Sequence, residues 1–503
     1  MQKRVNLYIT FILLRILINV TCENSPSVII VGAGPSGIAA ATKLYENGIT
    51  NFTILEAENR IGGRIYSTKF EDEIVELGAE LCHGMKDNIV YKLANVYNIL
   101  QPIEESKMNF CYSSQENVDE TFFYELFDLF NDVYDYGFNN VNDTISVGEY
   151  LTNRCNEAIT INYKNDKQKL KQATEFLDFY ITFLTLYSSP FSLFDLSLPL
   201  YYQKCEGSYI IIWKHGGYKM ILDILMKRYP DPKKQLPIEE KILLNKEVNK
   251  IAWKKTSNNS KNIFIETSDG FVFAADYLIF TPSLGVLKNT HRNLFVPHLP
   301  ENKVNAINKL GFGAVSKIFI HFPERWWPTT DSVNFQFVWS QEDKELMMRE
   351  FPFGPSKSER TWLLNVLSLE SMHEKSNIVT AWCGGEFVPE IEKLTDHLVI
   401  DGLMYILNKF LGDKYNITRP YAILRNNWYE NPHFRGTYSY ESVESRKEGT
   451  SQESVLAEPL KTSDGQDVVL FAGEATNPIH YSTVHGAIET GFREAQRIID
   501  TRQ

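Results

Sequence analysis

A glycine-rich turn between two short apolar segments constrains the fold of this chain more than any other feature. Residues 28–31 are β-branched and apolar, the turn Gly32-Ala33-Gly34-Pro35-Ser36-Gly37 follows, and residues 38–47 are typical of a helix. A second expected strand, 53–55, ends in Glu56, nineteen residues after Gly37. Strand, glycine turn, helix, strand and acid in this order predict a βαβ unit that binds a dinucleotide. We therefore expect an α/β fold with a Rossmann-type domain.

Each residue type in this unit has a physical role in dinucleotide binding. Gly32 and Gly34 let backbone N–H groups approach a pyrophosphate, and Gly37 lets the helix lie close to the strand. The N-terminus of the helix turns its positive end toward the phosphates. Glu56 is placed to accept hydrogen bonds from the ribose hydroxyls. A purely structural glycine turn is the alternative, but it does not explain the acid at the end of the second strand.

A second pair of glycines favours FAD over a nicotinamide cofactor. The chain continues after Glu56 as Ala57-Glu58-Asn59-Arg60-Ile61-Gly62-Gly63-Arg64. The backbone at Gly63 can again come close to a phosphate, and the planar guanidinium of Arg64 can neutralise it. An ordinary nicotinamide dehydrogenase does not need a second loop of this kind.

Charge and cysteine usage exclude several classes of protein. Lys and Arg number 51 and Asp and Glu 63, a formal net charge of −12. Binding to nucleic acids or anionic lipid needs a cationic surface, so we expect neither partner, and an acidic protein suits a cationic ligand better. Five scattered cysteines follow residue 22 and predict buried thiols without a disulfide framework: Cys82, Cys111, Cys155, Cys205 and Cys383.

The N-terminus has the order of residues found in a secretory signal. Lys3 and Arg4 precede an apolar run, 7–20, and small or polar residues follow. We expect residues 1–22 to be a signal peptide and the protein to be secreted or to reside in the lumen of the secretory pathway. The alternative is an uncleaved membrane anchor. Because polar residues interrupt a run already shorter than a membrane span, we expect no stable membrane insertion.

Several motifs together resemble those of the flavin-containing amine oxidases. Besides the glycine turn and the stretch 56–64, these are Glu76-Leu77-Gly78-Ala79 with His83-Gly84, Phe471-Ala472-Gly473-Glu474-Ala475-Thr476, and Tyr481-Ser482-Thr483-Val484-His485-Gly486-Ala487. Within that family the chain is most similar to the animal polyamine oxidases, which comprise the spermine and N-acetylpolyamine oxidases. The resemblance extends from about residue 27 to residue 499. Its terminal FAD-binding blocks are highly specific, whereas its middle is looser.

The resemblance implies a domain organisation that hydrophobic periodicity alone does not show. In such proteins a Rossmann-type FAD-binding domain is assembled from discontinuous segments, here 27–98, 241–286 and 455–503. The intervening segments, 99–240 and 287–454, then form an interleaved α+β substrate-binding domain. The pattern is compatible with β-rich runs at 246–253, 263–267 and 271–280 and with helical spacing at 120–135 and 167–186.

The resemblance also implies further residues that hold FAD. These are Gly78 and Ala79, Val248 through its backbone near the adenine, Trp428 beside the flavin, Glu474 near the ribityl or phosphate region, and Thr483 with Val484 before a helix expected at 487–499. The N-terminus of that helix would stabilise negative charge on reduced flavin. Thr437 stands where monoamine oxidases carry the cysteine that bonds FAD, so we expect noncovalent FAD.

Lys317 is the leading candidate catalytic residue. It lies in the apolar strand-like stretch 311–322, where an unpaired charge is costly. A lysine there can extend outward to solvent or pair with a carboxylate. The resemblance implies instead that it holds a water against flavin N5 and assists the reaction with oxygen. Since Met has a similar volume without the charge, Lys317→Met is expected to change stability little.

His83 is the second candidate, as a catalytic and substrate-contacting residue. In animal polyamine oxidases the matching histidine lies beside the substrate amine, and a histidine can accept from an amine near neutral pH. The family's usual Trp-Ile pair before this histidine is replaced by Leu81-Cys82, which can reshape the pocket. Tyr438 and Thr483 are the other expected substrate contacts. The remaining histidines lack ligand spacing, so no metal site is predicted.

The resemblance implies FAD-dependent oxidation of a polyamine (spermine, spermidine or an N-acetyl derivative) by oxygen, with an aldehyde, a shorter amine and hydrogen peroxide as products. Two alternatives remain. A secreted L-amino-acid oxidase would need an arginine for the substrate carboxylate, and the sequence assigns none. A catalytically silent secreted flavoprotein with a binding role is supported by the Leu81-Cys82 change and opposed by the presence of Lys317 and Glu474.

Overall fold

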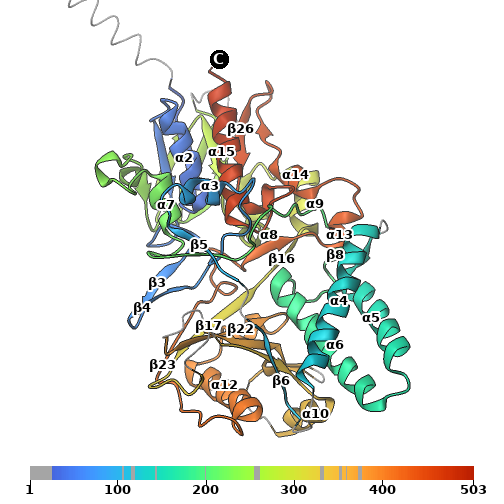
Figure 1. Ribbon diagram of the computed structural model, residues 1–503. Helices are drawn as coiled ribbons and strands as arrows, with labels where there is room; N and C mark the ends of the chain where they lie inside the picture. The colour runs from blue at the N-terminus through green and yellow to red at the C-terminus, as the bar shows by residue number, and fades with distance from the viewer. Residues whose placement is uncertain are drawn as a thin grey trace, which may run out of the picture.

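The structure is a computed structural model that describes residues 25–104, 107–114, 119–141, 144–198, 200–253, 261–328, 333–350, 354–357, 360–371 and 376–502. The expected signal peptide at 1–22 lies outside these ranges. Figure 1 shows an upper part, in which the first and last described segments lie side by side, and a lower part built on a second sheet.

A six-stranded, mainly parallel sheet organises the upper part. Its strand order is β10-β2-β1-β14-β26-β25, and all neighbouring pairs are parallel except the edge pair β25–β26. The strands are β10 (Ile242–Leu243), β2 (Phe52–Leu55), β1 (Val28–Val31), β14 (Tyr277–Phe280), β26 (Asp467–Phe471) and β25 (Leu460–Lys461). Segments more than 400 residues apart thus meet in one sheet, and the α/β fold expected from the glycine turn is confirmed.

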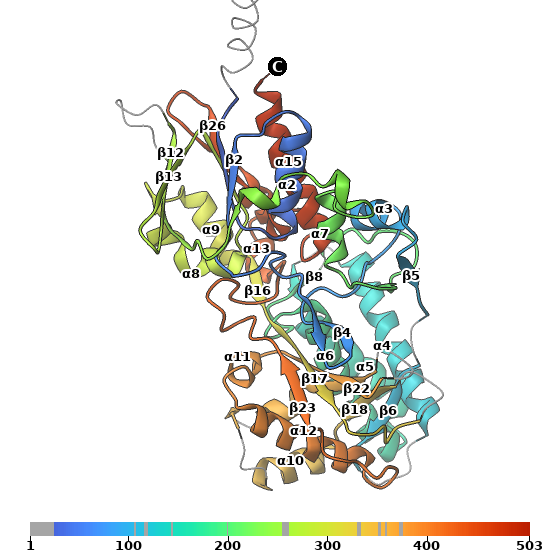
Figure 2. The same ribbon diagram turned by 90° about the vertical axis from the view of Figure 1, so that its left-hand side faces the viewer.

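Two helices from opposite ends of the chain cover one face of this sheet. α2 (Pro35–Glu46) begins directly after the glycine turn with proline at its first position, and it continues through three alanines. α15 (Val484–Asp500) lies against it, as both side views show (Figures 1 and 2). The approach is so close that a Cβ on Gly491 would lie 2.1 Å from the backbone oxygen of Ser36. Glycine at this position therefore lets the two helices touch.

Two apolar cores flank the parallel sheet. One contains α2, α15, α3 (Ile89–Asn95), β9 (Ile211–Trp213) and α7 (Met220–Leu225). The other contains residues of β11 (Val248–Ala252), β12 (Ile263–Thr267), α8 (Leu284–Leu294) and α9 (Glu301–Lys309). Apolar residues within 211–238 and 287–310 thus pack against the parallel sheet. The expected boundaries had assigned these two segments to the substrate domain. The division into domains otherwise stays a prediction.

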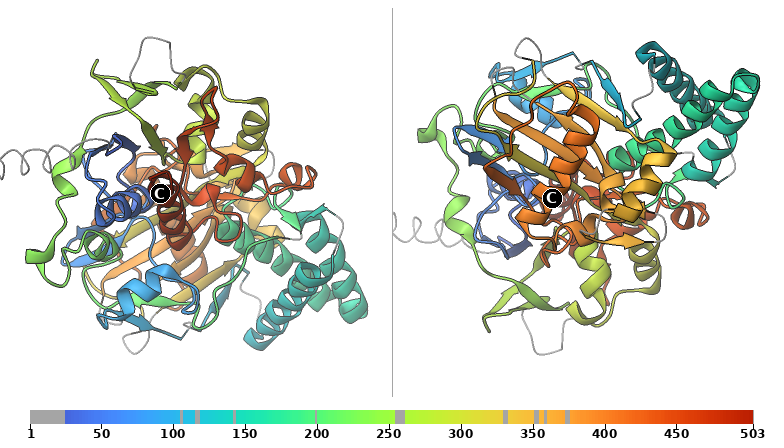
Figure 3. Two further views of the ribbon diagram at one scale, coloured as in Figure 1. Left: turned by 90° about the horizontal axis from the view of Figure 1, so that it is seen from above. Right: turned by 90° about the horizontal axis from the view of Figure 1, so that it is seen from below.

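A second six-stranded sheet organises the lower part. Its strand order is β23-β17-β22-β21-β18-β6, with antiparallel pairs except for β18–β6. The strands are β23 (Ala422–Arg425), β17 (Val315–His321), β22 (Ile378–Gly384), β21 (Val366–Glu370), β18 (Asn334–Val338) and β6 (Asn109–Tyr112). The helix α12 (Asp396–Leu411) covers one face (Figure 3, right). The other face packs against α6 (Lys167–Ser188), which contacts α4 (Glu120–Asn140) and α5 (Val147–Tyr163).

Shorter elements complete the fold, and β13 and β15 form a four-stranded sheet with β12 and β11. The strands are β3 (Ser67–Phe70), β4 (Glu73–Glu76), β5 (Leu100–Pro102), β7 (Ile145–Ser146), β8 (Ser197–Leu198), β13 (Val272–Ala275), β15 (Phe295–Val296), β16 (Gly311–Gly313) and β24 (Tyr438–Tyr440). The helices are α10 (Gln341–Glu350), α11 (Val388–Ile391), α13 (Val443–Arg446), α14 (Gln452–Ala457) and the 3₁₀ turn η4 (Glu474–Thr476). Among the helices of the described ranges, none combines the length and the hydropathy that crossing a membrane requires.

Candidate active site

A cavity of about 690 Å³ collects nearly all of the residues that the sequence analysis selected. The expected FAD contacts that line it are Gly32, Gly34, Glu56, Gly63, Arg64, Gly78, Ala79, Val248, Trp428, Glu474, Thr483 and Val484. Lys317, His83 and Tyr438 line the same cavity. Gly37 lies behind the wall, where a Cβ would be 2.0 Å from the Gly32 oxygen. The fold therefore brings the candidates together, while their roles stay predictions.

The glycine turn forms a cradle that only a residue without a side chain can make. Gly32 has φ +103°, and a Cβ there would lie 2.4 Å from the Thr281 hydroxyl oxygen. A Cβ on Gly63 would lie 3.2 Å from the Cα of Gly34, so the two glycine loops touch. The hydroxyl of Ser36 at the start of α2 is buried, has no hydrogen-bond partner among the described residues, and lines the cavity. A phosphate oxygen would satisfy this donor, so the site fits the pyrophosphate of FAD.

Glu56 anchors the turn at the end of β2. Its two carboxylate oxygens accept from the backbone N–H groups of Ala33 (2.7 Å) and Glu58 (2.9 Å). Burial raises the pKa of this carboxyl above its ordinary value, and the two N–H donors oppose that shift. The side chain faces the cavity at the position where the sequence analysis placed a ribose.

Glu474 connects four separate segments of the chain. Its Oε1 accepts from Nη1 of Arg64 (2.8 Å), and its Oε2 accepts from the backbone N–H of Ser482 (2.9 Å) and the hydroxyl of Ser439 (2.6 Å). Arg64 Nη1 also donates to the backbone oxygen of Thr437 (2.6 Å). Arg64 was predicted to face a phosphate, and that role stays a prediction. In the structure it forms an ion pair with Glu474, with the two side chains 25% and 5% exposed.

The N-terminus of α15 opens onto the cavity. Thr483 is the N-cap, with its Oγ1 accepting from the Gly486 N–H (3.0 Å) and donating to the His480 backbone oxygen (2.7 Å). The helix begins at Val484 rather than at the predicted residue 487, because the cap is satisfied three residues earlier. The positive end of the helix dipole therefore lies at the cavity wall, where negative charge is stabilised.

The indole of Trp428 closes one side of the cavity. It is buried and donates from Nε1 to the backbone oxygen of Leu77 (2.9 Å). A Cβ on Gly78 would lie 1.9 Å from the Arg64 backbone oxygen and 3.2 Å from the Trp428 ring, so glycine is required there. The carboxylate of Glu392 holds the same loop by accepting from the backbone N–H groups of Tyr429 and Glu430.

Lys317 pairs with a carboxylate, one of the arrangements that the sequence left open, and its role toward flavin stays a prediction. It lies on β17, lines the cavity, and donates from Nζ to Oε2 of Glu80 at 2.7 Å, with the two side chains only 8% and 14% exposed. The Trp382 ring is 5.1 Å from Nζ. Two further carboxyls nearby, Glu76 and Glu370, have pKa values raised by burial to about 7. Glu80 was not selected from the sequence, although a lysine inside an apolar strand signals that some carboxylate must meet it.

His83 and Tyr438 lie on the wall that is rich in aromatic residues. The His83 ring stacks on Tyr209 at 4.4 Å between centroids, and its Nδ1 is 2.9 Å from the Tyr209 backbone oxygen. Burial lowers the pKa of His83, which favours the neutral imidazole. Tyr438 donates its hydroxyl to the Tyr187 backbone oxygen at 3.3 Å. Further aromatic residues line this part of the cavity, namely Tyr134, Phe138, Phe183, Tyr202 and Trp382.

The charged groups that line the cavity are of both signs, and they include the basic Lys204 and Lys246. Glu80 and the exposed Asp135 line it, and they add negative charge near the aromatic wall. Among the described residues that line the cavity, Arg64 is the sole arginine, and it is paired with Glu474. The described lining residues thus include no second arginine that could hold the carboxylate of an amino acid.

Comparison with known proteins agrees with this geometry. The family model described as flavin containing amine oxidoreductase matches residues 35–499. The chain is 29% identical to a probable polyamine oxidase 5 of Arabidopsis thaliana, over 94% of this chain and 98% of the plant protein. It is also 29% identical to the peroxisomal N(1)-acetyl-spermine/spermidine oxidases of Bos taurus and Homo sapiens, over 94% of this chain and 94% and 95% of theirs.

A solved structure supports the fold independently. The model superimposes on a double mutant of putrescine oxidase with a redesigned cofactor site at a TM-score of 0.60, with 17% sequence identity, over 94% of this chain and 99% of the other. At this identity the likeness concerns the fold.

Proposed function

Because the chain belongs to the flavin-containing amine oxidoreductase family and is an FAD-dependent amine oxidase, we propose that its substrate is a polyamine such as spermine, spermidine or an N-acetyl derivative. The products would be an aldehyde, a shorter amine and hydrogen peroxide. FAD is bound noncovalently, consistent with Thr437 on the cavity wall.

FAD, when bound, accepts a hydride equivalent from the carbon next to the amine nitrogen and passes the electrons to oxygen. The chain holds and orients the reactants. The two glycine loops and the N-terminus of α2 would hold the pyrophosphate, and Trp428 with the start of α15 would hold the flavin end. Nζ of Lys317 uses one N–H on Glu80, and a lysine has three donors, so this group can also hold a water in the cavity.

The observation that carries the substrate proposal is the composition of the cavity beyond Lys317. A polyamine is a long cation, and aromatic faces together with Glu80 and Asp135 suit such a chain. His83, kept neutral by burial, would not repel it and could accept a proton from the reacting amine. An L-amino acid would need a cationic partner for its carboxylate. Arg64, Lys246 and Lys317 are paired with carboxylates, so the exposed Lys204 is the lining residue that would have to serve.

A peroxide assay of the purified flavoprotein tests the proposal. The panel contains spermine, spermidine, their N-acetyl forms, a monoamine such as benzylamine, and several L-amino acids. We expect peroxide with at least one polyamine and none with the amino acids. Peroxide from amino acids alone would favour an L-amino-acid oxidase, and a yellow, folded protein that is silent on the whole panel would overturn the polyamine proposal.

A further inference from the structure

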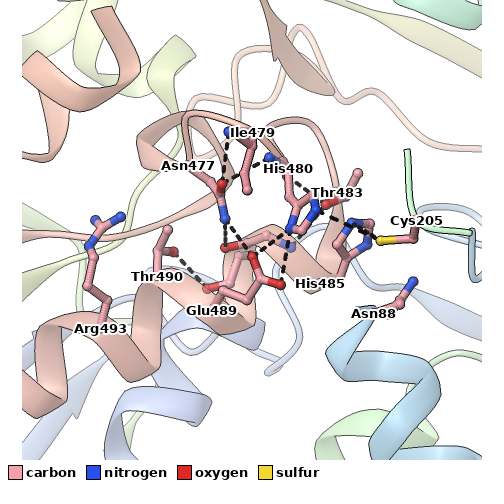
Figure 4. Close-up of polar contacts among 12 residues, drawn as sticks. Asn88, Cys205, Asn477, Ile479, His480, Thr483, His485, Glu489, Thr490 and Arg493 are labelled. Atoms are coloured by element: carbon pink, nitrogen blue, oxygen red, sulfur yellow. Dashed lines mark hydrogen bonds and ion pairs between the residues drawn. The ribbon is translucent and has the colours of Figure 1, made fainter. Parts of the chain in front are cut away.

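Three metal-ligating side chains from distant parts of the chain meet beside the start of α15. Cys205 precedes β9, His480 lies in the loop after η4, and His485 is the second residue of α15 (Figure 4). The Cys205 Sγ is 3.9 Å from Nε2 of each histidine, and the three donor atoms lie within 4.8 Å of one another. All three side chains are buried, with 9%, 6% and 2% of their surface exposed.

The sulfur–nitrogen separations are slightly longer than those of a metal site. Tetrahedral zinc holds sulfur at about 2.3 Å and nitrogen at about 2.0–2.1 Å, which places the sulfur about 3.5 Å from each nitrogen. The observed sulfur–nitrogen distances of 3.9 Å exceed this value by a few tenths of an ångström. The two nitrogens lie within 4.8 Å of each other, against about 3.4 Å in a tetrahedral site, so one imidazole must move inward by up to about 1.4 Å to bind zinc. Without a metal, the Cys205 thiol can donate to Nε2 of His480 while His485 donates its Nε2–H to the sulfur, so the test must distinguish this hydrogen-bonded arrangement from a metal site.

A chain of hydrogen bonds fixes the orientation of His480. Its Nδ1 is 2.9 Å from the Glu489 carboxylate, which can only accept when ionised, so the proton lies on Nδ1 and the lone pair on Nε2 points to Cys205. Glu489 in turn accepts from Nδ2 of Asn477 (2.8 Å). Asn477 Oδ1 accepts from the backbone N–H groups of Ile479 and His480, as Figure 4 shows. Carboxylates that orient a ligating histidine in this way are typical of zinc proteins.

The loop is held tightly enough to keep this geometry. Thr483 donates to the His480 backbone oxygen at 2.7 Å, and a Cβ on Gly486 would lie 1.9 Å from the same oxygen. His480 is thus fixed by hydrogen bonds at its side chain, with Glu489, and at its backbone oxygen, with Thr483. The sequence analysis predicted no metal site, because Cys205 stands 275 residues before His480 and no ligand spacing is visible.

We propose that Cys205, His480 and His485 bind one zinc ion, with a water molecule as the fourth ligand. Three protein ligands of the Cys/His type with an open fourth position are a known zinc arrangement. A redox-inactive ion also suits a site whose ligand His485 lines the proposed flavin cavity, since it does not divert electrons. The ion would tie the segment that carries Cys205 to the N-terminus of α15, with Glu489 as a positioning residue.

The test measures zinc in the FAD-containing protein. The wild-type protein, Cys205→Ser, Glu489→Gln and the control Cys111→Ser are dialysed against buffered zinc chloride at several free concentrations, and zinc per FAD is measured by mass spectrometry. Cys111 is a half-buried thiol on β6, in the lower sheet and outside the cluster. We expect one zinc per chain in the wild type and the control, at least a tenfold loss for Cys205→Ser, and about 10- to 100-fold weaker binding for Glu489→Gln.

X-ray absorption at the zinc edge identifies the atoms bound to zinc in the wild-type protein. Because it uses no variant, its result does not depend on whether the variants fold. We expect one sulfur and two imidazole nitrogens around zinc. Equal zinc contents in wild type and Cys205→Ser, a spectrum without sulfur, or a wild-type protein that takes up no zinc would overturn the proposal.

Discussion

The buried pair of Lys317 and Glu80 predicts a strong thermodynamic coupling. Lys317→Met leaves the Glu80 carboxylate without its cation in a nearly closed cavity wall, and Glu80→Gln leaves the ammonium group without its anion. The double variant removes both charges. We therefore expect each single variant to be clearly less stable than wild type and the double variant to recover much of the loss.

The magnitude follows from the geometry of the pair. Unit charges 2.7 Å apart attract by about 6 kcal/mol at an effective dielectric constant of about 20. The cost of removing both groups from water opposes this attraction, and loss of one partner from a buried pair typically destabilises by about 3–5 kcal/mol. Because Glu76 also acts on Lys317, the lower end of that range is expected for Glu80→Gln. This reverses the sequence-based expectation that Lys317→Met changes stability little.

The assay is a double-mutant cycle on the free energy of unfolding in urea, at one fixed saturating concentration of FAD. A control cycle uses Lys250 and Glu266, an ion pair of 3.1 Å between β11 and β12 with side chains 44% and 48% exposed. We expect a coupling energy of about 2 kcal/mol or more for Lys317 and Glu80 and below about 1 kcal/mol for the control. If the two single effects simply add in the double variant, the buried pair does not exist as described.

Three other predictions concern different parts of the protein. Stopped-flow measurements without and with oxygen separate reduction of the flavin by the amine from its reoxidation by oxygen. Lys317→Met should mainly slow reoxidation, and His83→Ala should mainly slow reduction. Wild-type rates of both steps in these variants would show that neither residue takes part in the mechanism. Burial raises the pKa of Glu392 from 4.5 to about 7. Between these two pH values the folded protein keeps a proton on Glu392 that the unfolded chain releases. The free energy of unfolding therefore falls as the pH rises through this range. In Glu392→Gln this decline should lessen by up to about 1.4 kcal/mol per pH unit, and unchanged pH profiles would refute it. N-terminal sequencing of protein from expressing cells should begin after about residue 22, whereas a cytosolic chain beginning at Met1 would refute the signal peptide.

Local sequence was sufficient to predict the elements that bind dinucleotides. β1, the glycine turn, α2 and β2 follow one another directly, so their spacing carries the information that the fold uses. The motif around Glu474 and Thr483 was equally clear from its resemblance to a known family. The start of α15 was misplaced by three residues, because the capping hydrogen bond of Thr483 decides it and no periodicity reports that bond.

The partners of these residues were not predictable, because the fold brings them from far away. Glu80 stands 237 residues before Lys317, and an apolar strand shows only that a charge must be compensated, not by which carboxylate. The same holds for the triad of Cys205, His480 and His485, which sequence spacing cannot assemble. Leu81-Cys82 remained ambiguous in sequence. In the structure Cys82 is buried and forms an isolated β-bridge with Ile211, whereas Leu81 lines the cavity. Of the two residues that depart from the family pattern, Leu81 is therefore the one that shapes the pocket.

The order of strands in the parallel sheet also sets the time at which the active site can exist during synthesis. β1 ends at residue 31, but β26 begins at residue 467, and α15, which packs on α2, follows it. A ribosome adds about 5–20 residues per second, so about 20–90 s pass between the emergence of the first strand and that of β26. Throughout this interval α2 lacks the helix that covers it, and β14, once it has been made, has no partner on its β26 side. The cofactor can therefore be captured fully only by a nearly finished chain, and truncation before residue 467 is expected to abolish FAD retention.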